Sequence, residues 1–358
     1  MTGPYMREQE PPMPEVDIPP QSDTAASVPD SGSGGRGGGT ARRMRSVLAA
    51  QEAGLAGVVL VVVLFLTWRS PYFLTTGNLV VVGRLAALSL IIAVGMTFVI
   101  LAAGIDLSVG STVALTSIIT GEAMVTLGLN PVLAVVLALA GGVAVGLVNG
   151  LIVASTAIPS FVVTLGMLAA ARGLALGITK GQTLSGLPAG FLVLGQGSIA
   201  GVPIPVWIAV LAALVAHVVL TRTRFGRNVY FIGSNEQAAV LSGIRVFRTK
   251  VAIFAIAGGL AGLEGVIETA RLSVGQPSAG NGYELVAIGA VVIGGTSLFG
   301  GEGSILGTVL GTTLLALIQN GLILLGISAY WQQVFSGVII VAAVALNMWR
   351  QQRSRGGT

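Results

Sequence analysis

A few acids, amides and hydroxyls stand inside long apolar stretches of this 358-residue chain, and they are its candidates for chemistry. Polar groups at membrane depth are costly, and they tend to face a cavity, a partner or a transport pathway. Such groups can exchange hydrogen bonds with a hydroxylated solute, although holding helices together is the simpler role of any single one. The candidate pathway residues are Asp106, Ser108, Asn149, Ser160, Thr164, Glu284 and Asn320.

Two of the acids stand where an apolar segment begins. Asp106 opens the third such segment and Glu284 opens the eighth. A negative charge in the first turn of a helix complements the helix dipole, so capping is the simpler role of both residues.

Three further acids lie within apolar segments. Glu264 and Glu268 are one helical turn apart, and Arg271 follows three residues later. They are either a structural pair with Arg271 or Arg84, or part of a pathway, and the sequence favours neither interpretation. Glu122 leaves the same two interpretations open.

Several kinds of chemistry have no residues to carry them. The chain has no cysteine and one histidine, His217, so thiol, metal and histidine-based catalysis have little support. It has no Gly-x-x-x-x-Gly-Lys-Ser/Thr loop for a nucleotide, and we expect it not to hydrolyse ATP itself. The sequence therefore predicts no catalytic site, no metal and no cofactor on this chain. Its net charge of +5 indicates membrane orientation rather than nucleic-acid binding.

The elements that must position these residues are membrane-spanning helices. Charged residues make up 9% of the chain, against roughly 25% in soluble domains. A spanning helix needs about 20 mostly apolar residues. We expect an all-α polytopic membrane protein, with a disordered tail over 1–45, a transmembrane domain over 46–349 and a basic tail over 350–358. The ten expected spans are 53–69, 79–102, 107–127, 131–154, 160–178, 203–220, 250–270, 284–299, 304–325 and 330–349.

Basic residues between the spans predict the orientation. Cytoplasmic loops carry an excess of Lys and Arg. With the N-terminus in the cytoplasm, the outer loops carry only Arg69, Lys180 and Arg271. The inner segments then carry Arg42, Arg43, Arg45, Arg222, Arg224, Arg227, Arg245, Arg248, Lys250, Arg350, Arg353 and Arg355. Both termini and the loop 221–250 are therefore expected in the cytoplasm.

Short internal matches pair spans that are five apart. "GIDL" (Gly104–Leu107) opens the third span and "GYEL" (Gly282–Leu285) the eighth. "VNGLI" (Val148–Ile152) and "QNGLI" (Gln319–Ile323) lie in the fourth and ninth. An odd offset reverses direction across the membrane, so the matches predict an inverted repeat of two five-helix halves, as in many transporters.

The polar block from Gly226 to Lys250 contains signals for a short helix. Ser234–Gln237 fits a capping box and Gly243 fits a helix stop, which predicts a helix over Asn235–Ser242. So short a helix is marginal alone and would need a docking partner. The alternative is an ordinary loop made basic by the orientation rule. The apolar surface that the helix offers consists of Ala238, Ala239 and Leu241.

Four stretches from about residue 80 to 349 together resemble the permease subunits of bacterial ribose/xylose-type ABC sugar importers. They are "AAGIDLSVGS" (Ala102–Ser111), "GSNEQAAVLSGI" (Gly233–Ile244), "QPSAGNGYELVAIGAVVIGGTSLFGGEGSILGT" (Gln276–Thr308) and "QNGLILLGIS" (Gln319–Ser328). The resemblance implies that the helix in the cytoplasmic block couples the chain to an ATPase. The candidate coupling residues are Gly233, Ser234, Asn235, Glu236, Ala238, Ala239, Leu241, Ser242 and Gly243.

The resemblance also implies partners. They are a cytoplasmic ABC ATPase that binds ATP and Mg²⁺, an extracytoplasmic sugar-binding protein, and a second permease subunit in a homodimer within the bacterial inner membrane. The expected solute is a monosaccharide or polyol. Glu264 and Glu268 stand where the family is expected to have small or apolar residues.

Three alternatives remain: a permease for branched-chain amino acids or another small solute, a proton-coupled carrier, or a membrane-embedded enzyme. If the short helix couples the chain to an ATPase, Glu236→Pro should abolish sugar-stimulated ATP hydrolysis by the reconstituted complex while the subunit still inserts.

Overall fold

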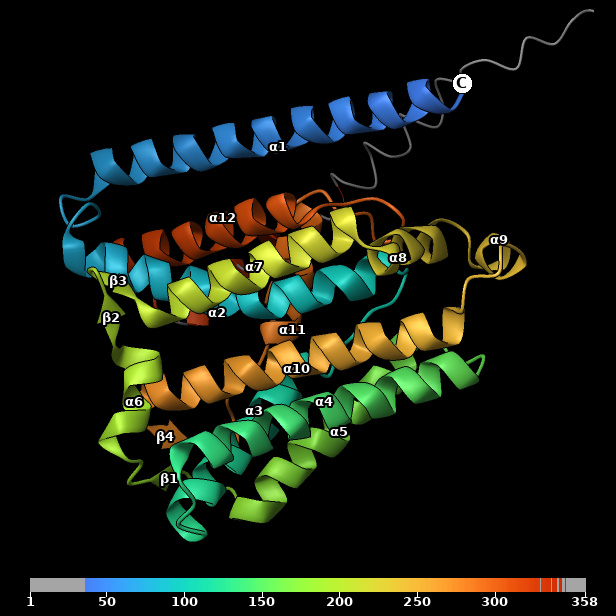
Figure 1. Cartoon of the computed structure of the whole chain (residues 1–358). Coiled ribbons are helices and arrows are strands. Elements are labelled where there is room, and N and C mark those ends of the chain that lie inside the picture. Colours follow the sequence, from blue (N-terminus) through green and yellow to red (C-terminus); the bar gives the residue numbers. More distant parts are fainter. Residues whose placement is uncertain (1–35, 329, 336, 340, 343–344, 346–358) are drawn as a thin grey trace, which may run out of the picture. The chain divides into compact units, whose positions relative to one another are not determined.

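The computed structural model describes residues 36–328, 330–335, 337–339, 341–342 and 345, with side chains from residue 51 onward. Met1–Arg43 and Met44–Thr358 are separate units. The helices of the described residues, shown in Figure 1, are α1 (Arg36–Arg69), which begins in the smaller unit, and, all in the larger one, α2 (Thr76–Leu101), α3 (Val109–Gly121), α4 (Pro131–Ser155), α5 (Ser160–Thr179), α6 (Ala189–Gln196), α7 (Ile204–Arg222), α8 (Arg224–Ser234), α9 (Glu236–Leu241), α10 (Val246–Leu272), α11 (Tyr283–Ile293) and α12 (Ile305–Leu324). A π-helical turn, Glu122–Thr126, continues α3.

Eight helices in the described part of the chain are long and apolar enough to cross a membrane, which confirms the all-α polytopic fold. The expected eighth span, 284–299, is shorter than predicted. It is α11, whose 11 residues reach only about 16 Å. The helix stops there because Gly295 adopts a φ of +92°.

The two ends of the chain are described only in part. α1 begins at Arg36, within the stretch 1–45 that was expected to be disordered, and residues 1–35 lie outside those described. For the expected span 330–349, residues 330–335, 337–339, 341–342 and 345 are helical, and the others lie outside the described residues, as does the basic tail 350–358.

The contacts between helices follow the expected inverted repeat. α2 packs against α11 and α12, whereas α10 packs against α3 and α4. The sequence matches pair α3 with α11 and α4 with α12. The second and seventh spans, α2 and α10, therefore occupy equivalent places, and each packs against the helix pair of the other half.

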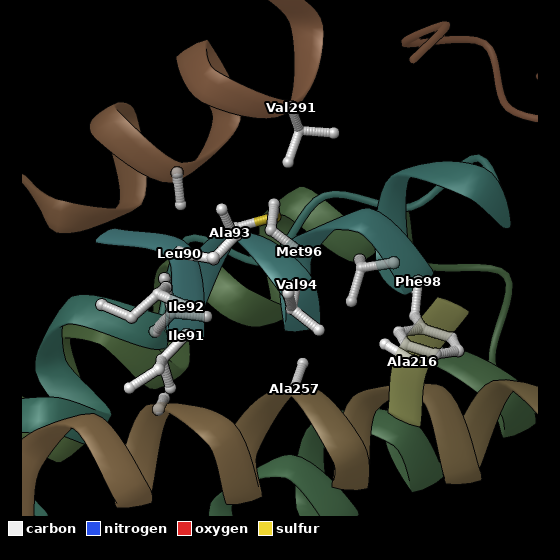
Figure 2. Close-up of a cluster of buried hydrophobic side chains, with 14 of the residues drawn as sticks. Leu90, Ile91, Ile92, Ala93, Val94, Met96, Phe98, Ala216, Ala257 and Val291 are labelled. Atoms are coloured by element: carbon white, nitrogen blue, oxygen red, sulfur yellow. The ribbon is translucent and has the colours of Figure 1, made fainter. Parts of the chain in front are cut away.

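The centre of the fold is α2, which is buried on all sides along its second half. A helix that is apolar all round must be covered all round. Figure 2 shows its side chains between Ala257 of α10, Ala216 of α7 and Val291 of α11. At Gly95 the backbones come close, because an added Cβ would lie 3.0 Å from the Cα of Ala257.

Small residues allow α4 and α10 to pack closely. Gly142, Gly146 and Gly150 recur at every fourth position of α4, on one face. A Cβ on Gly142 would lie 2.9 Å from the Cα of Gly262, and one on Gly150 would lie 2.8 Å from the Cα of Val251. Helices associate in lipid through such close packing because no hydrophobic effect drives them together.

Two irregular segments interrupt the bundle. Residues 102–108 separate α2 from α3, and residues 273–282 separate α10 from α11. The second segment packs against α3 near Gly280, where an added Cβ would lie 2.9 Å from the Cβ of Val113. The second segment carries the strand β4 (Val274–Gly275), which pairs antiparallel with β1 (Leu184–Ser185). A further small hairpin pairs β2 (Ser198–Ile199) with β3 (Val202–Pro203).

Candidate functional site

The segment 102–108 gathers most of the predicted pathway residues. Two hydroxyls of α5 satisfy its backbone: Ser160 Oγ accepts from the Ile105 amide at 3.0 Å, and Thr164 Oγ1 accepts from the Leu107 amide at 3.1 Å. Irregular backbone at membrane depth is tolerated only where neighbouring groups satisfy it. Both hydroxyls therefore hold the interrupted segment in place.

Asp106, Ser108 and Asn149 form a buried chain of hydrogen bonds beside this segment. Asp106 Oδ1 accepts from the Ser108 amide at 2.8 Å and from Ser108 Oγ at 2.6 Å. Asn149 Nδ2, on α4, donates to Ser108 Oγ at 2.8 Å. Capping of the first turn of α3 was the expected role of Asp106. Its carboxylate instead accepts both hydrogen bonds from Ser108, two residues away. Within the described residues, Asn149 Oδ1 is buried without a hydrogen-bond partner.

Glu284 lies close to the same group. It stands in the first turn of α11, as expected for an acid at a helix start. A Cβ added to Gly110, in the first turn of α3, would overlap its carboxylate. The two short helices therefore begin next to each other in the interior.

Arg172 of α5 also reaches this centre, although it is not among the residues predicted from the sequence. Its guanidinium donates to the carbonyl oxygens of Pro277 at 2.8 Å and Ala279 at 2.7 Å, and to that of Gly110 at 3.3 Å. One side chain thus joins the segment before α11 to the first turn of α3. The sequence did contain a signal, because a charge in the middle of an apolar helix indicates an internal partner.

Asn320 does not belong to this group, contrary to its place among the pathway candidates. It exchanges two hydrogen bonds with Asn78, at 2.7 and 3.1 Å. Asn78 is near the start of α2, whereas the segment 102–108 follows its end. Asn320 therefore links α12 to the start of α2, at the end far from the segment 102–108. The two amides pair because polar side chains between membrane helices hydrogen-bond to each other.

The two acids of α10 have different environments. Glu268 forms two hydrogen bonds to Arg271, both at 2.7 Å, and accepts one from Tyr283 Oη at 3.3 Å. Glu264 is fully buried, and neither of its oxygens has a hydrogen-bond partner in the described part of the chain. The structural interpretation therefore holds for Glu268. Arg84 instead donates to the backbone oxygen of Gln196.

The segment 221–250 holds two short helices before α10, instead of the one predicted. The additional helix, α8, begins after Thr223, whose hydroxyl accepts from the Gly226 amide at 3.1 Å. Val229 and Ile232 are buried and Phe231 is exposed. The sequence did contain a signal for α8. Val229 and Ile232 are three residues apart, as on one face of a helix, and they follow a threonine that can cap it.

α8 connects both halves of the repeat. Gly233 packs so tightly that a Cβ there would overlap the Leu101 carbonyl oxygen, and the Gly301 amide donates to that same oxygen at 2.9 Å. Tyr230 Oη donates to the Gly303 carbonyl oxygen at 2.9 Å. Burial raises the pKa of Tyr230, so its hydroxyl keeps the donated proton.

The second helix, α9, is present but is capped differently from the prediction. Asn235, with φ −163° and ψ 104°, is the N-cap, and its side chain accepts from the Ala238 amide at 2.9 Å. Ser234 is instead the last residue of α8, and its hydroxyl donates to the Tyr230 carbonyl oxygen. Position 236 is therefore N1, where proline is tolerated, so Glu236→Pro is not the disruptive substitution that the sequence predicted.

The other end of α9 agrees with the sequence. Gly243 adopts a φ of +77°, and the bonds Gly243 N to Val240 O and Ile244 N to Ala239 O complete a Schellman motif. The exposed surface agrees with the prediction at Ala238 and Leu241, but Ala239 is buried and Val240 is exposed in its place. Figure 1 shows α8 and α9 at the end of the bundle opposite to β1–β4.

A cavity of about 420 Å³ lies between the segment 102–108 and α9. Its wall joins residues of both candidate sites. They are Val99, Ala102, Ala103, Gly104, Ile105, Val153, Thr156, Ala157, Ile158, Pro159, Ser160, Phe161, Glu236, Lys250, Ile253, Phe254 and Leu298.

Comparison with known proteins shows which family the chain belongs to. The family described as the permease component of branched-chain amino acid transport systems matches residues 78–344. The chain belongs to this permease family. The match covers all the helices of the candidate site and the whole segment 221–250.

Individual relatives resemble the permease over most of its length. It is 44% identical over 300 residues to the ribose import permease protein of Escherichia coli (strain K12), covering 82% of this chain and 92% of that protein. It is 44% identical over 289 residues to the ribose import permease protein of Bacillus subtilis (strain 168), covering 80% and 89%. It is 36% identical over 362 residues to the xylose transport system permease protein of E. coli (strain K12), covering 84% and 92%. No solved structure matched the permease.

Proposed function

We propose that the permease is the membrane subunit of an ATP-driven (ABC) importer for a monosaccharide or related polyol. The observation that carries this proposal is its 36–44% identity, over four fifths of the chain, to relatives named for ribose, D-allose and xylose. The family description names branched-chain amino acids, but the relatives that match nearly end to end are sugar permeases. The sugar assignment is therefore the better supported of the two.

The partners follow from the same proposal. A cytoplasmic ABC ATPase binds ATP and Mg²⁺ and docks on α9, where Val240 and the 89%-exposed Leu241 are free to be covered. An extracytoplasmic sugar-binding protein delivers the solute, and a second copy of the chain completes a homodimer. The complex lies in the bacterial inner membrane with both permease termini in the cytoplasm.

The solute pathway runs along the interrupted segments near Asp106, Ser108 and Asn149. Transporter sites form where helices are discontinuous, because backbone and polar side chains there are available to a solute. The unpartnered Asn149 Oδ1 supports this assignment, since a buried free acceptor can bind a hydroxyl when the pathway opens. Ser160 and Thr164 position the segment from α5, whereas Asn320 takes no part.

Uptake by the assembled complex tests the function. The tagged full-length chain is purified from its native membranes with the proteins that accompany it and is reconstituted in proteoliposomes. We expect ATP-dependent uptake of at least one of D-ribose, D-allose and D-xylose, and none of leucine. Uptake of leucine alone would support the amino-acid alternative. Uptake by the chain alone under a proton gradient, without ATP, would overturn the proposal.

Coupling is tested by breaking α9. Val240→Pro removes an exposed side chain and the backbone N–H of the fifth residue of the six-residue helix, at a cost of about 3 kcal/mol. We expect sugar-stimulated ATP hydrolysis to fall to the basal rate while the permease still inserts in the membrane. The matched control is Val240→Ala, which keeps the helix. Normal stimulation in the proline variant would contradict the assignment of α9 as the coupling helix.

A further inference from the structure

An ion pair joins the first residue of α9 to the second turn of α10. Lys250 Nζ lies 2.7 Å from Glu236 Oε1 and 2.8 Å from Glu236 Oε2. The side chain of Lys250 is 18% exposed and that of Glu236 is 51% exposed. Both residues line the 420 Å³ cavity, so the pair forms part of its wall.

The opposite wall belongs to the proposed pathway. It contains the interrupted backbone from Ala102 to Ile105 and Ser160, whose hydroxyl holds the Ile105 amide. The volume suits a small polyhydroxylated molecule, since ligand sites begin at about 300 Å³. Backbone and hydroxyl groups on one side and a charged pair on the other provide both donors and acceptors for such a molecule.

We propose that this cavity is the cytoplasmic exit chamber for the solute and that the Glu236–Lys250 pair is its gate. The solute class rests on the proposed function, whereas the gate rests on the geometry alone. Glu236 moves with α9, a capped unit of six residues, and Lys250 belongs to the long helix α10. A displacement of α9 by its partner separates the two charges and widens the opening of the chamber on the side of α9.

The native chain has no cysteine, so a single introduced thiol reports on the chamber. Val153 lines the cavity and is 8% exposed, so a thiol at that position reacts slowly in this conformation and faster when the chamber widens. The labelling rate with a membrane-impermeant maleimide is measured for the assembled complex in inside-out vesicles without ATP. Each rate is normalised to the labelling reached after denaturation.

Neutralising either charge should open the chamber. We expect Glu236→Gln or Lys250→Gln to accelerate labelling at position 153 by about fivefold, which corresponds to about 1 kcal/mol for a partly exposed pair. The reversed pair, Glu236→Lys with Lys250→Glu, should restore slow labelling. Arg248→Gln, which removes a nearby exposed charge outside the cavity wall, is the control and should leave the rate unchanged.

Two results would overturn the gate: equal acceleration by Arg248→Gln, or fast labelling that persists in the reversed pair. The solute is tested separately by adding D-ribose, D-allose or D-xylose to the open variant. If any of these sugars slows labelling of the thiol at position 153, the cavity is a solute chamber. If none of them does, the assignment of the cavity as a solute chamber is overturned. A gate that behaves as expected in a complex that imports no sugar would refute the proposed function and leave the gate standing.

Discussion

At the scale of single residues, polar side chains in this permease mainly satisfy interrupted backbone. Ser160 and Thr164 accept from amides that no helix can satisfy, and Arg172 donates to three carbonyl oxygens. Unpaired backbone groups in hydrocarbon cost several kcal/mol each, so every break in a helix requires such residues. The same side chains therefore position the proposed pathway.

Thr164→Val tests this role, because it keeps the shape of the side chain and removes the hydroxyl. The Leu107 amide loses its acceptor, and we expect the free energy of unfolding to fall by about 1–3 kcal/mol. The midpoint of thermal unfolding of the purified permease gives the measurement. Thr164→Ser keeps the hydroxyl and should stay closer to the wild type. An unchanged midpoint in the valine variant would argue against the role.

The acids of α10 should respond in opposite ways to the same substitution. Glu268→Leu leaves Arg271 without its carboxylate, and loss of one partner costs about 3–5 kcal/mol in a fully buried pair. Arg271 is 30% exposed, so we expect a smaller loss of thermal stability. Glu264→Leu removes a buried carboxyl without a hydrogen-bond partner and should leave stability unchanged or raise it. Equal losses in the two variants would show that Glu264 has a structural role of its own.

At the scale of elements, glycine determines how closely α4 and α10 approach. A Cβ on Gly146 would lie 2.9 Å from the Phe254 carbonyl carbon, which a packed helix pair cannot accommodate without shifting. We expect Gly146→Ala to destabilise the permease by about 1–3 kcal/mol. Thermal unfolding in detergent and the yield from membranes give the measurements.

Gly166 of α5 is the matched control for this prediction. An added Cβ there meets nothing within 4 Å, so Gly166→Ala should be neutral or slightly stabilising. If the two alanine variants unfold at the same temperature, the close approach of α4 and α10 does not contribute to stability.

At the scale of the whole molecule, two interrupted halves pack across each other. α2 of the first half contacts α11 and α12 of the second, and α10 of the second contacts α3 and α4 of the first. α8 also contacts the end of α2 at Leu101 and the connection between α11 and α12 at Gly301. Movement of α8 would therefore reach both halves at once, as alternating access requires.

The orientation of the permease can be measured with two thiols. Gln237→Cys lies on exposed α9 and Lys180→Cys on the exposed connection after α5. We expect an impermeant maleimide to label position 237 only in inside-out vesicles and position 180 only in right-side-out vesicles. Labelling of both positions from one side would contradict the expected topology.

The sequence alone determined the properties that depend on local composition. Apolar runs of about 20 residues predicted the membrane helices, since lipid accepts little else. Gly243 predicted the end of α9, and the order of short matches predicted the inverted repeat. The sequence also identified five polar side chains within apolar segments, although it did not show that they lie close together. They are Asp106, Ser108, Asn149, Ser160 and Thr164.

Only the tertiary structure decided which groups are partners. Asn149 binds Ser108 from 41 residues away, and Arg172 binds Pro277 from 105 residues away, while Asn320 turns to Asn78 instead. Ser234 lost the capping role to Asn235 because the preceding helix extends through it. A buried polar group takes the nearest partner in space, and the packing of distant helices determines which group that is.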